Sequence, residues 1–337
     1  MLFSIIVTIF NGEAFIASCI DSVLRNPSGN YELIIIDDGS IDNTGKICDS
    51  YTDRYDFVKC VHTGNQGIGN ARQAGLDAAS GDYIIFVDGD DVWEESFCLD
   101  KIEEEIKKSR ADLYVFGYVL RRTKSDGNKD HHFTVRASSF EDWRDNQDQF
   151  LSYFPDGLMF FCWNKIFRRQ CILDNNVLSV QQHMEDFRFV LDFLKGAKKV
   201  VFLPGEFYCH IKRGGNSLTS TARQGMLEGH NLCHHIFLSL FDKEHEAMIN
   251  QIMASAYIGT VNHQLSFIER HEDEITSLRI LDNINENDFA QLAFRHYHAS
   301  SFSEKISFSL IRNGHFRALI LYRKIVTVVK RFLSSNK

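Results

Sequence analysis

Three carboxylates fall within four positions directly after a run of apolar residues. Residues 83–87 (Tyr-Ile-Ile-Phe-Val) do not alternate between apolar and polar side chains, so they predict a strand buried on both faces. Asp88, Asp90 and Asp91 follow that strand. Acids crowded at a sheet edge repel one another, and a divalent cation that prefers oxygen ligands relieves the repulsion. An isolated Asp-x-Asp is more often a solvated turn, so the motif depends on its context.

A second acidic pair, Glu185 and Asp186, precedes apolar residues with helical spacing. Acids in the first turn of a helix complement its dipole, which is a structural reason for the pair. A carboxylate in this position can also act as a general base that removes a proton from an attacking hydroxyl. Both interpretations stay open on the pair alone.

A cationic segment follows a strand predicted at residues 200–204. Lys212 and Arg213 stand before two glycines, and Ser217 comes soon after them. This composition predicts a flexible cationic loop, which could close over an anionic ligand and offset its charge. His210 is either a metal ligand or a histidine whose hydrogen bonds the protein itself satisfies.

The elements that position these residues alternate between strand and helix. Strands are predicted at 3–10, 31–36, 57–62 and 83–87, and helices at 14–24, 42–51 and 70–80. This order is typical of a parallel sheet with right-handed crossovers, which binds ligands beyond the carboxyl ends of its strands. We therefore expect the acids and the glycine-rich loop 63–69 at one rim. No dinucleotide G-x-G-x-x-G follows the first strand, and no P-loop sequence occurs.

Four blocks within residues 1–95 resemble the inverting glycosyltransferases of family 2, which make bacterial polysaccharides such as capsules and O-antigens. The blocks are 4–13 (SIIVTIFNGE), 36–44 (IDDGSIDNT), 65–75 (NQGIGNARQAG) and 86–91 (FVDGDD). The resemblance implies a GT-A fold, an α/β architecture with a Rossmann-like, mostly parallel sheet flanked by helices. It also implies hexosyltransferase activity, a UDP-sugar donor and a Mn²⁺ or Mg²⁺ ion.

The resemblance further implies roles for individual residues. Those implied in nucleotide-sugar binding are Thr8, Phe10, Glu13, Asp38, Asn65, Arg72, Asp88, Lys212, Arg213 and Ser217. Asp38 would accept from the uracil imide, and an aromatic side chain would pack on the base. Asp88 would meet the ribose, and Asp90, together with Asp88, would hold the metal that assists the leaving diphosphate. Asp186 resembles the catalytic base of the family, with Glu185 as a supporting or acceptor-binding residue.

The segment Trp163-Asn164-Lys165 is similar to a block that family members carry beneath the acceptor site. The resemblance therefore implies an acceptor-side role for all three residues. Ordinary packing of Trp163, with Lys165 in a surface salt bridge, explains the block equally well.

Composition restricts the remaining classes. The chain has 337 residues, is 44% hydrophobic and carries a net charge of −8, so it is globular and is not a nucleic-acid binder by composition. Eight cysteines form no C-x-x-C and fit no zinc spacing, which predicts reduced, mostly buried thiols in the cytoplasm. The apolar N-terminus lacks a basic segment, and no run of 18 apolar residues occurs, so we expect no signal peptide and no transmembrane helix.

Two regions are expected. Residues 1–220 form the catalytic domain, in which 1–95 bind the nucleotide-sugar and 96–220 face the acceptor, and residues 221–337 form a helical extension. After Glu304 the chain has eight basic residues and no acidic one, interleaved with apolar residues. This basic amphipathic end would dock on the anionic cytoplasmic face of the membrane, near a lipid-linked acceptor, or pack on its own domain or in a homodimer.

The leading hypothesis is a metal-dependent, inverting transfer of a sugar to a hydroxyl of a surface glycan. A rival from another class is a non-catalytic nucleotide-sugar-binding scaffold or regulator, which the intact Asp88, Asp90, Glu185 and Asp186 argue against. A nucleotidyltransferase would need a basic glycine-rich loop after the first strand, where residues 11–13 (Asn-Gly-Glu) offer none.

Overall fold

The computed structural model describes residues 2–26, 29–123, 130–213, 226–268, 288–299, 301–316, 318–319, 321–322 and 326. The chain divides into two compact units, Met1–Gly214 and Gly215–Lys337. The predicted boundary at residue 220 lies outside the described residues. Within the described part of the chain, no helix combines the length and the apolar character needed to cross a membrane.

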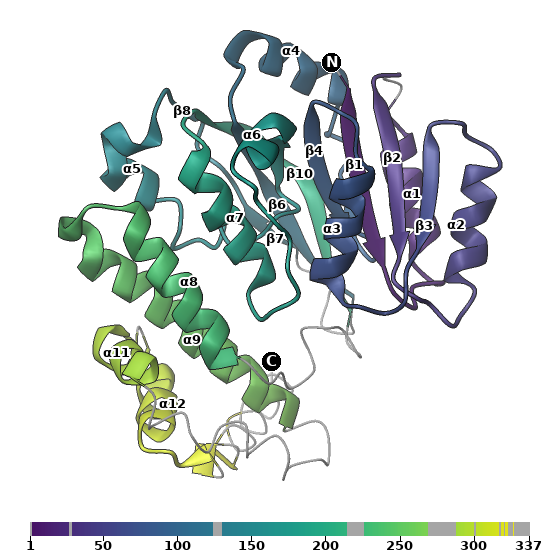
Figure 1. The fold of residues 1–337 in the computed structure, drawn as a ribbon. Coiled ribbons are helices and arrows are strands. Elements are labelled where there is room, and N and C mark those ends of the chain that lie inside the picture. The colour runs from purple at the N-terminus through teal and green to yellow at the C-terminus, as the bar shows by residue number, and fades with distance from the viewer. Residues whose placement is uncertain are drawn as a thin grey trace, which may run out of the picture. The chain divides into compact units, whose positions relative to one another are not determined.

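A single large sheet organises the N-terminal unit (Figure 1). Its described strands pair in the order β3-β2-β1-β4-β9-β6-β10-β5, with β7 on β6 and β8 on β10. The strands are β1 (Phe3–Ile9), β2 (Tyr31–Asp37), β3 (Val58–His62), β4 (Tyr83–Asp88), β5 (Val92–Trp93), β6 (Leu113–Thr123), β7 (His131–Phe133), β8 (Ser138–Phe140), β9 (Lys165–Arg168) and β10 (Val200–Arg213). The strands from β3 to β4 run parallel, β6 and β10 run parallel, and β9 runs antiparallel between the two groups. The predicted α/β fold with a mostly parallel sheet is confirmed.

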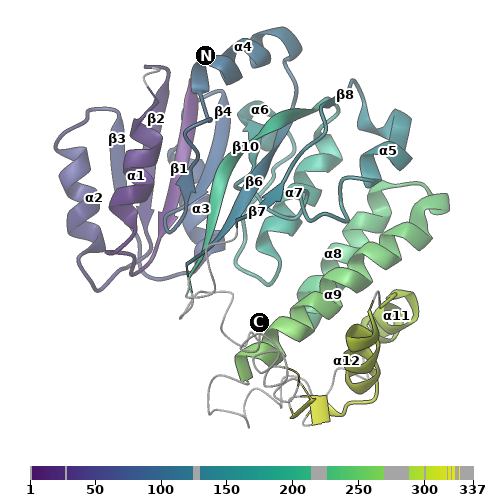
Figure 2. The same cartoon turned by 180° about the vertical axis from the view of Figure 1, so that it is seen from behind.

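Helices cover both faces of this sheet. They are α1 (Ile16–Leu24), α2 (Thr44–Thr52), α3 (Ile68–Ala78), α4 (Leu99–Ser109), α5 (Gln147–Leu151), α6 (Arg169–Asp174) and α7 (Glu185–Gly196). α3 and α7 lie over the face seen in Figure 1, and α1 lies over the opposite face seen in Figure 2. Every residue of β1 and β2 is buried, which is why these strands are mostly apolar and do not alternate between apolar and polar side chains.

One predicted element is wrong. The sequence predicts a helix over residues 139–154, with a cap-like Ser138 or Ser139 followed by Glu141. In the structure the segment begins as β8, and only a short 3₁₀ helix, η1 (Trp143–Asn146), and α5 follow. β8 pairs antiparallel with the start of β10, so that Phe140 lies against Phe202 with 6.0 Å between ring centroids. Pairing with a strand 60 residues further along the chain therefore overrides the local helical spacing.

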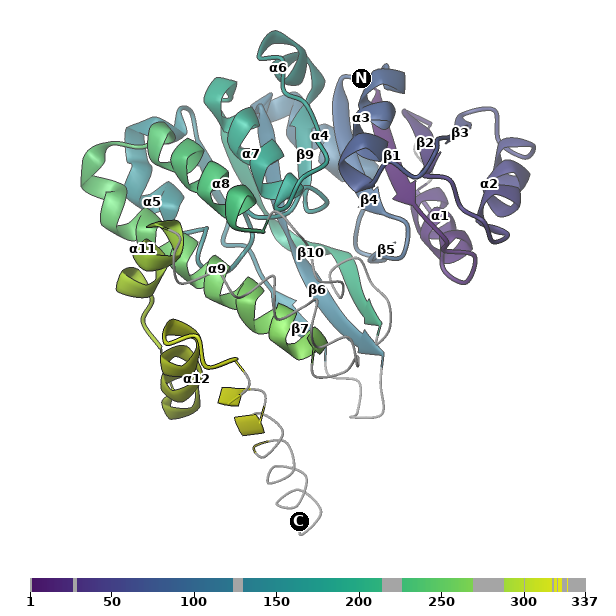
Figure 3. The ribbon, with the colours of Figure 1, turned by 60° about the horizontal axis from the view of Figure 1, so that its bottom comes forward.

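The second unit is helical (Figure 3). Its described elements are α8 (Met226–Leu240), η3 (Lys243–His245), α9 (Glu246–Ile268), α11 (Asp288–His296) and α12 (Phe302–Arg312). The predicted helical extension is confirmed for these segments. The sequence also predicts a helix over residues 316–333, within the basic amphipathic end, and most of that segment lies outside the described residues. His230 and His234 are buried in this unit, and His234 Nε2 lies 2.6 Å from Asn250 Oδ1. These two histidines therefore belong to the helical core.

Glu32 ties together the starts of four neighbouring strands. The Ser4 and Ser80 hydroxyls and the Ser80 backbone N–H each donate to Glu32 Oε1 at 2.7 Å, and Lys59 Nζ lies 2.9 Å from Oε2. Burial alone would raise the pKa of Glu32, but the hydrogen bonds from Lys59, Ser80 and Ser4 outweigh it and hold the pKa at about 2.

We expect Glu32→Gln to lower the free energy of unfolding by about 2–3 kcal/mol at pH 7. The folded pKa is lower than the usual value of 4.5, so the stabilising effect is present above that value and is lost as the pH falls toward 2. Urea unfolding of Glu32→Gln at pH 7 and at pH 3 measures the difference. Glu95→Gln, at an exposed position, serves as the control and should change stability by less than about 0.5 kcal/mol. An equal loss at both pH values would contradict the prediction.

Candidate active site

The ends of β1, β2 and β4 bring the predicted residues to one rim of the sheet. Thr8 pairs in register with Ile36 of β2 on one side and with Asp88 of β4 on the other. Asp38 follows directly after β2. The sheet register therefore places Thr8, Asp38 and Asp88 at the carboxyl ends of adjacent strands, where such sheets bind ligands.

A buried arginine joins two of the predicted acids. Arg72, on α3, is only 2% exposed. Its Nη1 donates to Asp186 Oδ1 and its Nη2 donates to Asp88 Oδ1 at 2.9 Å. Burial would lower the pKa of Arg72, but the charges of Asp186 and Asp88 raise it well above its usual value. One guanidinium thus fixes the distance between the strand-end acid and the helix-start acid.

The start of α7 is held against α3 by close backbone contacts. The Gly69 N–H donates to Gln181 Oε1 at 2.9 Å. A Cβ at Gly69 would lie 2.4 Å from Val180 O, and Gly67 has φ +89° beside the Gln181 side chain. The glycine-rich loop therefore lacks side chains at the points where segment 180–181 approaches it, which brings Asp186 within reach of Arg72.

The second oxygen of Asp186 faces the loop before β9. The Cys162 backbone N–H donates to Asp186 Oδ2 at 3.3 Å. Lys165 is fully buried and donates to the carbonyls of Leu158 and Phe161, each at 2.6 Å. Burial lowers the pKa of Lys165 to about 7. Lys165 therefore holds the loop that supplies the Cys162 N–H.

The rest of the Trp163-Asn164-Lys165 block is also internal. Asn164 is fully buried and donates to the carbonyls of Phe116 and Leu158 at 3.1 and 3.0 Å. Trp163 is 3% exposed and stacks on Tyr208, with 4.4 Å between ring centroids. The side chains thus support the site from behind, and direct contact of these residues with an acceptor stays a prediction.

The three acids after β4 have different environments. Asp91 is 1% exposed and accepts from Tyr208 Oη at 2.8 Å and from the Ile211 N–H at 2.7 Å, so it attaches the acidic turn to β10. The Asp90 side chain is 46% exposed. Burial and the neighbouring Asp91 charge raise the pKa of Asp90, although Arg213 and His210 oppose the shift.

Asp88 and Asp90 fit a hard divalent cation. Burial, together with the charges of Asp186 and Asp90, raises the pKa of Asp88 despite the opposing Arg72 charge. Two carboxylates whose charged forms are disfavoured, one of them open to solvent, are an oxygen donor set that Mn²⁺ or Mg²⁺ would stabilise.

The side chain of His210 has partners within the protein. His210 Nδ1 lies 3.0 Å from Asp91 Oδ2, and the ring stacks on Trp163. Burial would lower the pKa of His210, but the hydrogen bond and charge of Asp91 outweigh it and raise the pKa. The second of the two sequence interpretations, a satisfied histidine, describes this geometry.

Arginine 213 reaches the acidic turn from the end of β10. Its Nη1 donates to the carbonyl of Asp90 and lies 3.8 Å from Asp90 Oδ2, while its guanidinium carbon is 4.1 Å from the centre of the Phe15 ring. Lys212 is exposed beside it. Ser217 lies outside the described residues. The described part of the cationic segment is thus adjacent to the predicted metal ligands.

The predicted base-binding residues are placed less uniformly. Asp38 accepts hydrogen bonds from Thr63 Oγ1 and from the N–H groups of Gln66 and Gly67 at 2.7–2.8 Å, so it shapes the glycine-rich loop. These bonds use three of the about four lone-pair positions of the carboxylate. Phe10 is 37% exposed at the end of β1 and can offer its ring to a planar ligand. The buried Thr8 Oγ1 has no hydrogen-bond partner.

Two further predicted residues lie on exposed loops. Glu13 accepts from both the backbone N–H and the side-chain amide of Asn43 at 2.9 Å, which ties the loop after β1 to the start of α2. Asn65 is exposed on the glycine-rich loop. For both residues, nucleotide binding stays a prediction.

Sequence reasoning missed two supporting groups. Tyr208 is fully buried, and its hydroxyl both accepts from the Asp88 N–H at 3.1 Å and donates to Asp91. The Cys162 N–H contacts Asp186 as described above. Side chains alternate between the two faces of a strand, so Tyr208 and His210 lie on the same face of β10. This spacing is the sequence signal that could have identified Tyr208. A backbone donor such as that of Cys162 leaves no signal in residue type.

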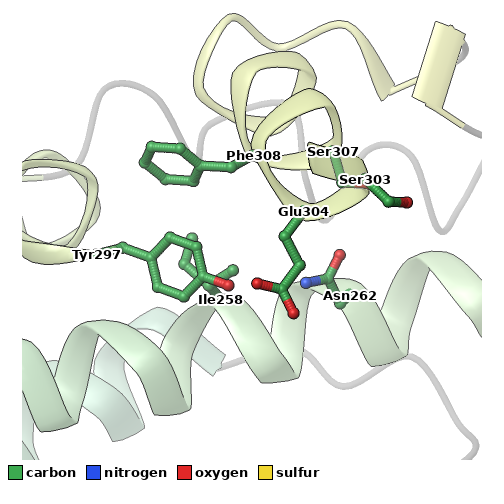
Figure 4. A pocket seen from close by; sticks show the side chains of 7 residues that line it. All are labelled: Ile258, Asn262, Tyr297, Ser303, Glu304, Ser307 and Phe308. Atoms are coloured by element: carbon green, nitrogen blue, oxygen red, sulfur yellow. The ribbon is translucent and has the colours of Figure 1, made fainter. Parts of the chain in front are cut away.

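A pocket in the helical unit includes none of these residues (Figure 4). Its lining comes from α9, from the residue that follows α11 and from α12, and comprises Ile258, Asn262, Tyr297, Ser303, Glu304, Ser307 and Phe308. Its carboxylate, Glu304, accepts from the Ser301 N–H and completes the capping box of α12. The pocket therefore offers no acid–base pair comparable to that of the rim.

Comparison with known proteins agrees with this geometry. The family model for glycosyl transferase family 2 matches residues 4–173, half of the chain. The uncharacterized glycosyltransferase EpsJ of Bacillus subtilis is 29% identical over 231 residues, which cover 68% of this chain and 66% of EpsJ. Glycosyltransferase GlyG of Streptococcus pneumoniae is 28% identical over 232 residues, covering 64% of this chain and 72% of GlyG.

The crystal structure of Staphylococcus aureus TarS 1-349 in complex with UDP-GlcNAc has a TM-score of 0.63 and 20% identity. The matched region covers 96% of this chain and 92% of the TarS chain, and the match shows that the two share a fold. The matched part of this chain spans about two thirds of the length of EpsJ. The membership expected from the four sequence blocks is confirmed, and this glycosyltransferase chain belongs to glycosyl transferase family 2.

Proposed function

We propose that the chain transfers a sugar from a UDP-sugar to a hydroxyl of a surface-glycan acceptor, with inversion at the anomeric carbon and with the help of a divalent metal ion. The observation that carries the proposal is the Arg72 bridge between Asp88 and Asp186. Through this bridge Asp186, at the start of α7, lies near Asp88, at the end of β4, which supports a proton acceptor beside a donor-binding acid. The UDP-sugar donor is supported by the TarS structure, which is titled as a complex with UDP-GlcNAc.

In this mechanism Asp186 takes the proton of the acceptor hydroxyl as the hydroxyl oxygen attacks the anomeric carbon. The bond from that carbon to the diphosphate oxygen breaks on the opposite face, and UDP leaves with the electron pair. Arg72 and the Cys162 N–H orient the two oxygens of Asp186. Because Arg72 also binds Asp88, movement of either acid changes the position of the other.

Asp88 and Asp90 would hold the metal, which when bound supplies Lewis-acid stabilisation to the leaving diphosphate. Arg213 already contacts the Asp90 carbonyl, so a small movement of the β10 end would bring its positive charge onto the diphosphate. The exposed Phe10 ring would pack on the uracil, and the glycine-rich loop shaped by Asp38 would border the ribose.

Removal of the metal should reduce transfer strongly. We expect EDTA, or Asp90→Asn, to lower UDP release by about 100-fold or more, because loss of a Lewis acid removes several kcal/mol of transition-state stabilisation. The assay is UDP release across a panel of UDP-sugars with Mn²⁺, with and without EDTA, and calorimetry gives the Mn²⁺-dependent affinity for UDP. Asp53→Asn, an exposed acid after α2, is the control. Unchanged UDP release in EDTA would refute the role of Asp90.

The lipid-linked acceptor and a peripheral position on the cytoplasmic membrane face rest on the basic amphipathic end of the sequence after Glu304. Most of that segment lies outside the described residues. Sedimentation of the full chain with anionic vesicles, compared with vesicles of neutral lipid, tests this part of the proposal. Equal sedimentation with both would contradict it.

A further inference from the structure

A cluster of metal-ligating side chains lies where β3, the first strand in the sheet order, meets α2. Asp49 comes from α2, and Cys60 and His62 come from β3; we name these three the β3–α2 cluster. One ligand atom from each lies within 4.8 Å of the other two. β2 and β1 separate β3 from β4, which carries the acids of the candidate active site, so the two groups are distinct in the sheet.

The distances within the cluster match a tetrahedral site. His62 Nε2 lies 3.7 Å from Cys60 Sγ and 3.0 Å from Asp49 Oδ1. Ligands around a tetrahedral zinc ion lie about 3.5 Å apart for thiolate and imidazole, and about 3.4 Å apart for imidazole and carboxylate. The two distances from His62 Nε2 therefore lie within a few tenths of an ångström of the tetrahedral values.

A second carboxylate orients the imidazole. His62 Nδ1 lies 2.9 Å from Oδ2 of the buried Asp37. A proton on Nδ1 donated to Asp37 leaves the Nε2 lone pair facing Cys60 and Asp49, which is the carboxylate–histidine arrangement found behind zinc ligands. Gly45 leaves the space for this pair, since a Cβ there would lie 3.0 Å from Asp37 Oδ2 and 3.3 Å from His62 Cε1.

The thiol also has a supporting partner. The buried Cys48 hydrogen-bonds Cys60, which lowers the pKa of Cys60 and raises that of Cys48. Cys60 is half-buried, and Asp49 and His62 are exposed, so an ion can reach the cluster from solvent.

The alternative is a plain ion-pair network. Without an ion, the hydrogen bonds to Asp37 and Asp49 raise the pKa of His62 to about 9, so a protonated imidazole holds the two carboxylates together. Such a network explains Asp37, Asp49 and His62. It does not require a sulfur atom next to Nε2.

We propose that Cys60, His62 and Asp49 bind a zinc-class divalent ion, with water as the fourth ligand. Sulfur and imidazole donors select zinc or cobalt over Mn²⁺ and Mg²⁺, which the oxygen donors of Asp88 and Asp90 suit. The ion would attach α2 to β3 and fix Asp37, the neighbour of the loop-shaping Asp38. The site is therefore structural and independent of the proposed transfer reaction.

The test uses the reduced full chain, stripped with EDTA and titrated with Co²⁺. We expect one equivalent to bind with a cobalt–thiolate charge-transfer band, and Zn²⁺ to displace it. Cys60→Ser should abolish the band, and Asp49→Asn and His62→Asn should each weaken Co²⁺ binding by about 100-fold. Cys98→Ser, at another half-buried thiol, and Asp90→Asn are the matched controls and should leave the band unchanged.

Zinc should also raise the melting temperature of the wild-type chain but not that of the Asp49→Asn variant. Because the Asp49 side chain is exposed, its replacement should leave the fold intact, so a lost response to zinc would not be explained by misfolding. Absence of a thiolate band in the folded wild type would overturn the proposal in favour of the ion-pair network. Equal loss in Cys60→Ser and Cys98→Ser would overturn it as well. UDP-release activity is measured in parallel, and its presence or absence does not decide this result.

Discussion

Asp186→Asn is expected to lower kcat by about 10²–10⁴-fold while UDP-sugar affinity changes little, because a general base acts on the acceptor proton and not on donor binding. An asparagine keeps an oxygen that can accept from Arg72, so the bridge to Asp88 is disturbed as little as a substitution allows. Single-turnover transfer and calorimetric binding of the UDP-sugar separate the two effects.

The matched control for Asp186→Asn is Asp192→Asn on the same helix. Asp192 pairs with Arg188 and Lys195 on α7 and contacts none of the rim residues among its described partners. Its replacement should leave kcat within about threefold of wild type. Retained transfer in Asp186→Asn would remove the base assignment, whereas wild-type protein that binds donor without any transfer would favour the scaffold function.

Arg72→Met is expected to cost about 3–5 kcal/mol of stability, because it leaves the carboxylates of Asp88 and Asp186 together without their shared cation. It should also lower kcat/KM by about 100-fold or more, since a displacement of about 1 Å at a reacting group has that effect. Thermal and urea unfolding give the stability loss, and initial rates below the melting temperature give kcat/KM.

Arg168→Met is the control for Arg72→Met. Arg168 also pairs with an acid, Asp112, at 2.6 Å, but its side chain is 43% exposed, so its loss should cost about 1 kcal/mol or less. The double variant Arg72→Met/Asp186→Asn removes one of the two carboxylates that repel each other once the Arg72 cation is gone. It should therefore be less destabilised than the sum of its parts by about 1–3 kcal/mol. Simple additivity would show that Arg72 and Asp186 do not interact in solution.

Local sequence patterns predicted the strands correctly where burial alone determines that a segment forms a strand. β1, β2 and β4 are covered on both faces, so their sequences are mostly apolar, and the polar residues Ser4 of β1 and Glu32 of β2 are hydrogen-bonded to each other. The pattern is informative because no polar residue can enter such a strand without a partner. It failed at β8, where the strand exists because β10 offers a partner and not because residues 138–140 prefer it.

Within the site, residue types and chain order nominated Asp88 and Asp90 as candidates, whereas Asp186 was nominated by resemblance to the family. A parallel sheet brings its strand ends together, so acids after successive strands had to share a rim. Contact partners were not predictable in this way. Arg72 was assigned to the nucleotide base by resemblance, yet its guanidinium lies between Asp88 and Asp186. One of the two interpretations placed Lys165 in a surface salt bridge, but its ammonium group instead donates buried hydrogen bonds to two carbonyls.

The sequence by itself determined the family, the alternating α/β order and the candidate acids of the site, since these depend on residue type and on local spacing. Only the tertiary structure decided which acid meets which cation and which side chains support the site from behind. It also brought Asp49, Cys60 and His62 together, although their spacing matches no zinc motif. The physical reason is the same in each case: contacts between residues far apart in the chain depend on the register and packing of whole elements, and single-residue patterns do not encode those distances.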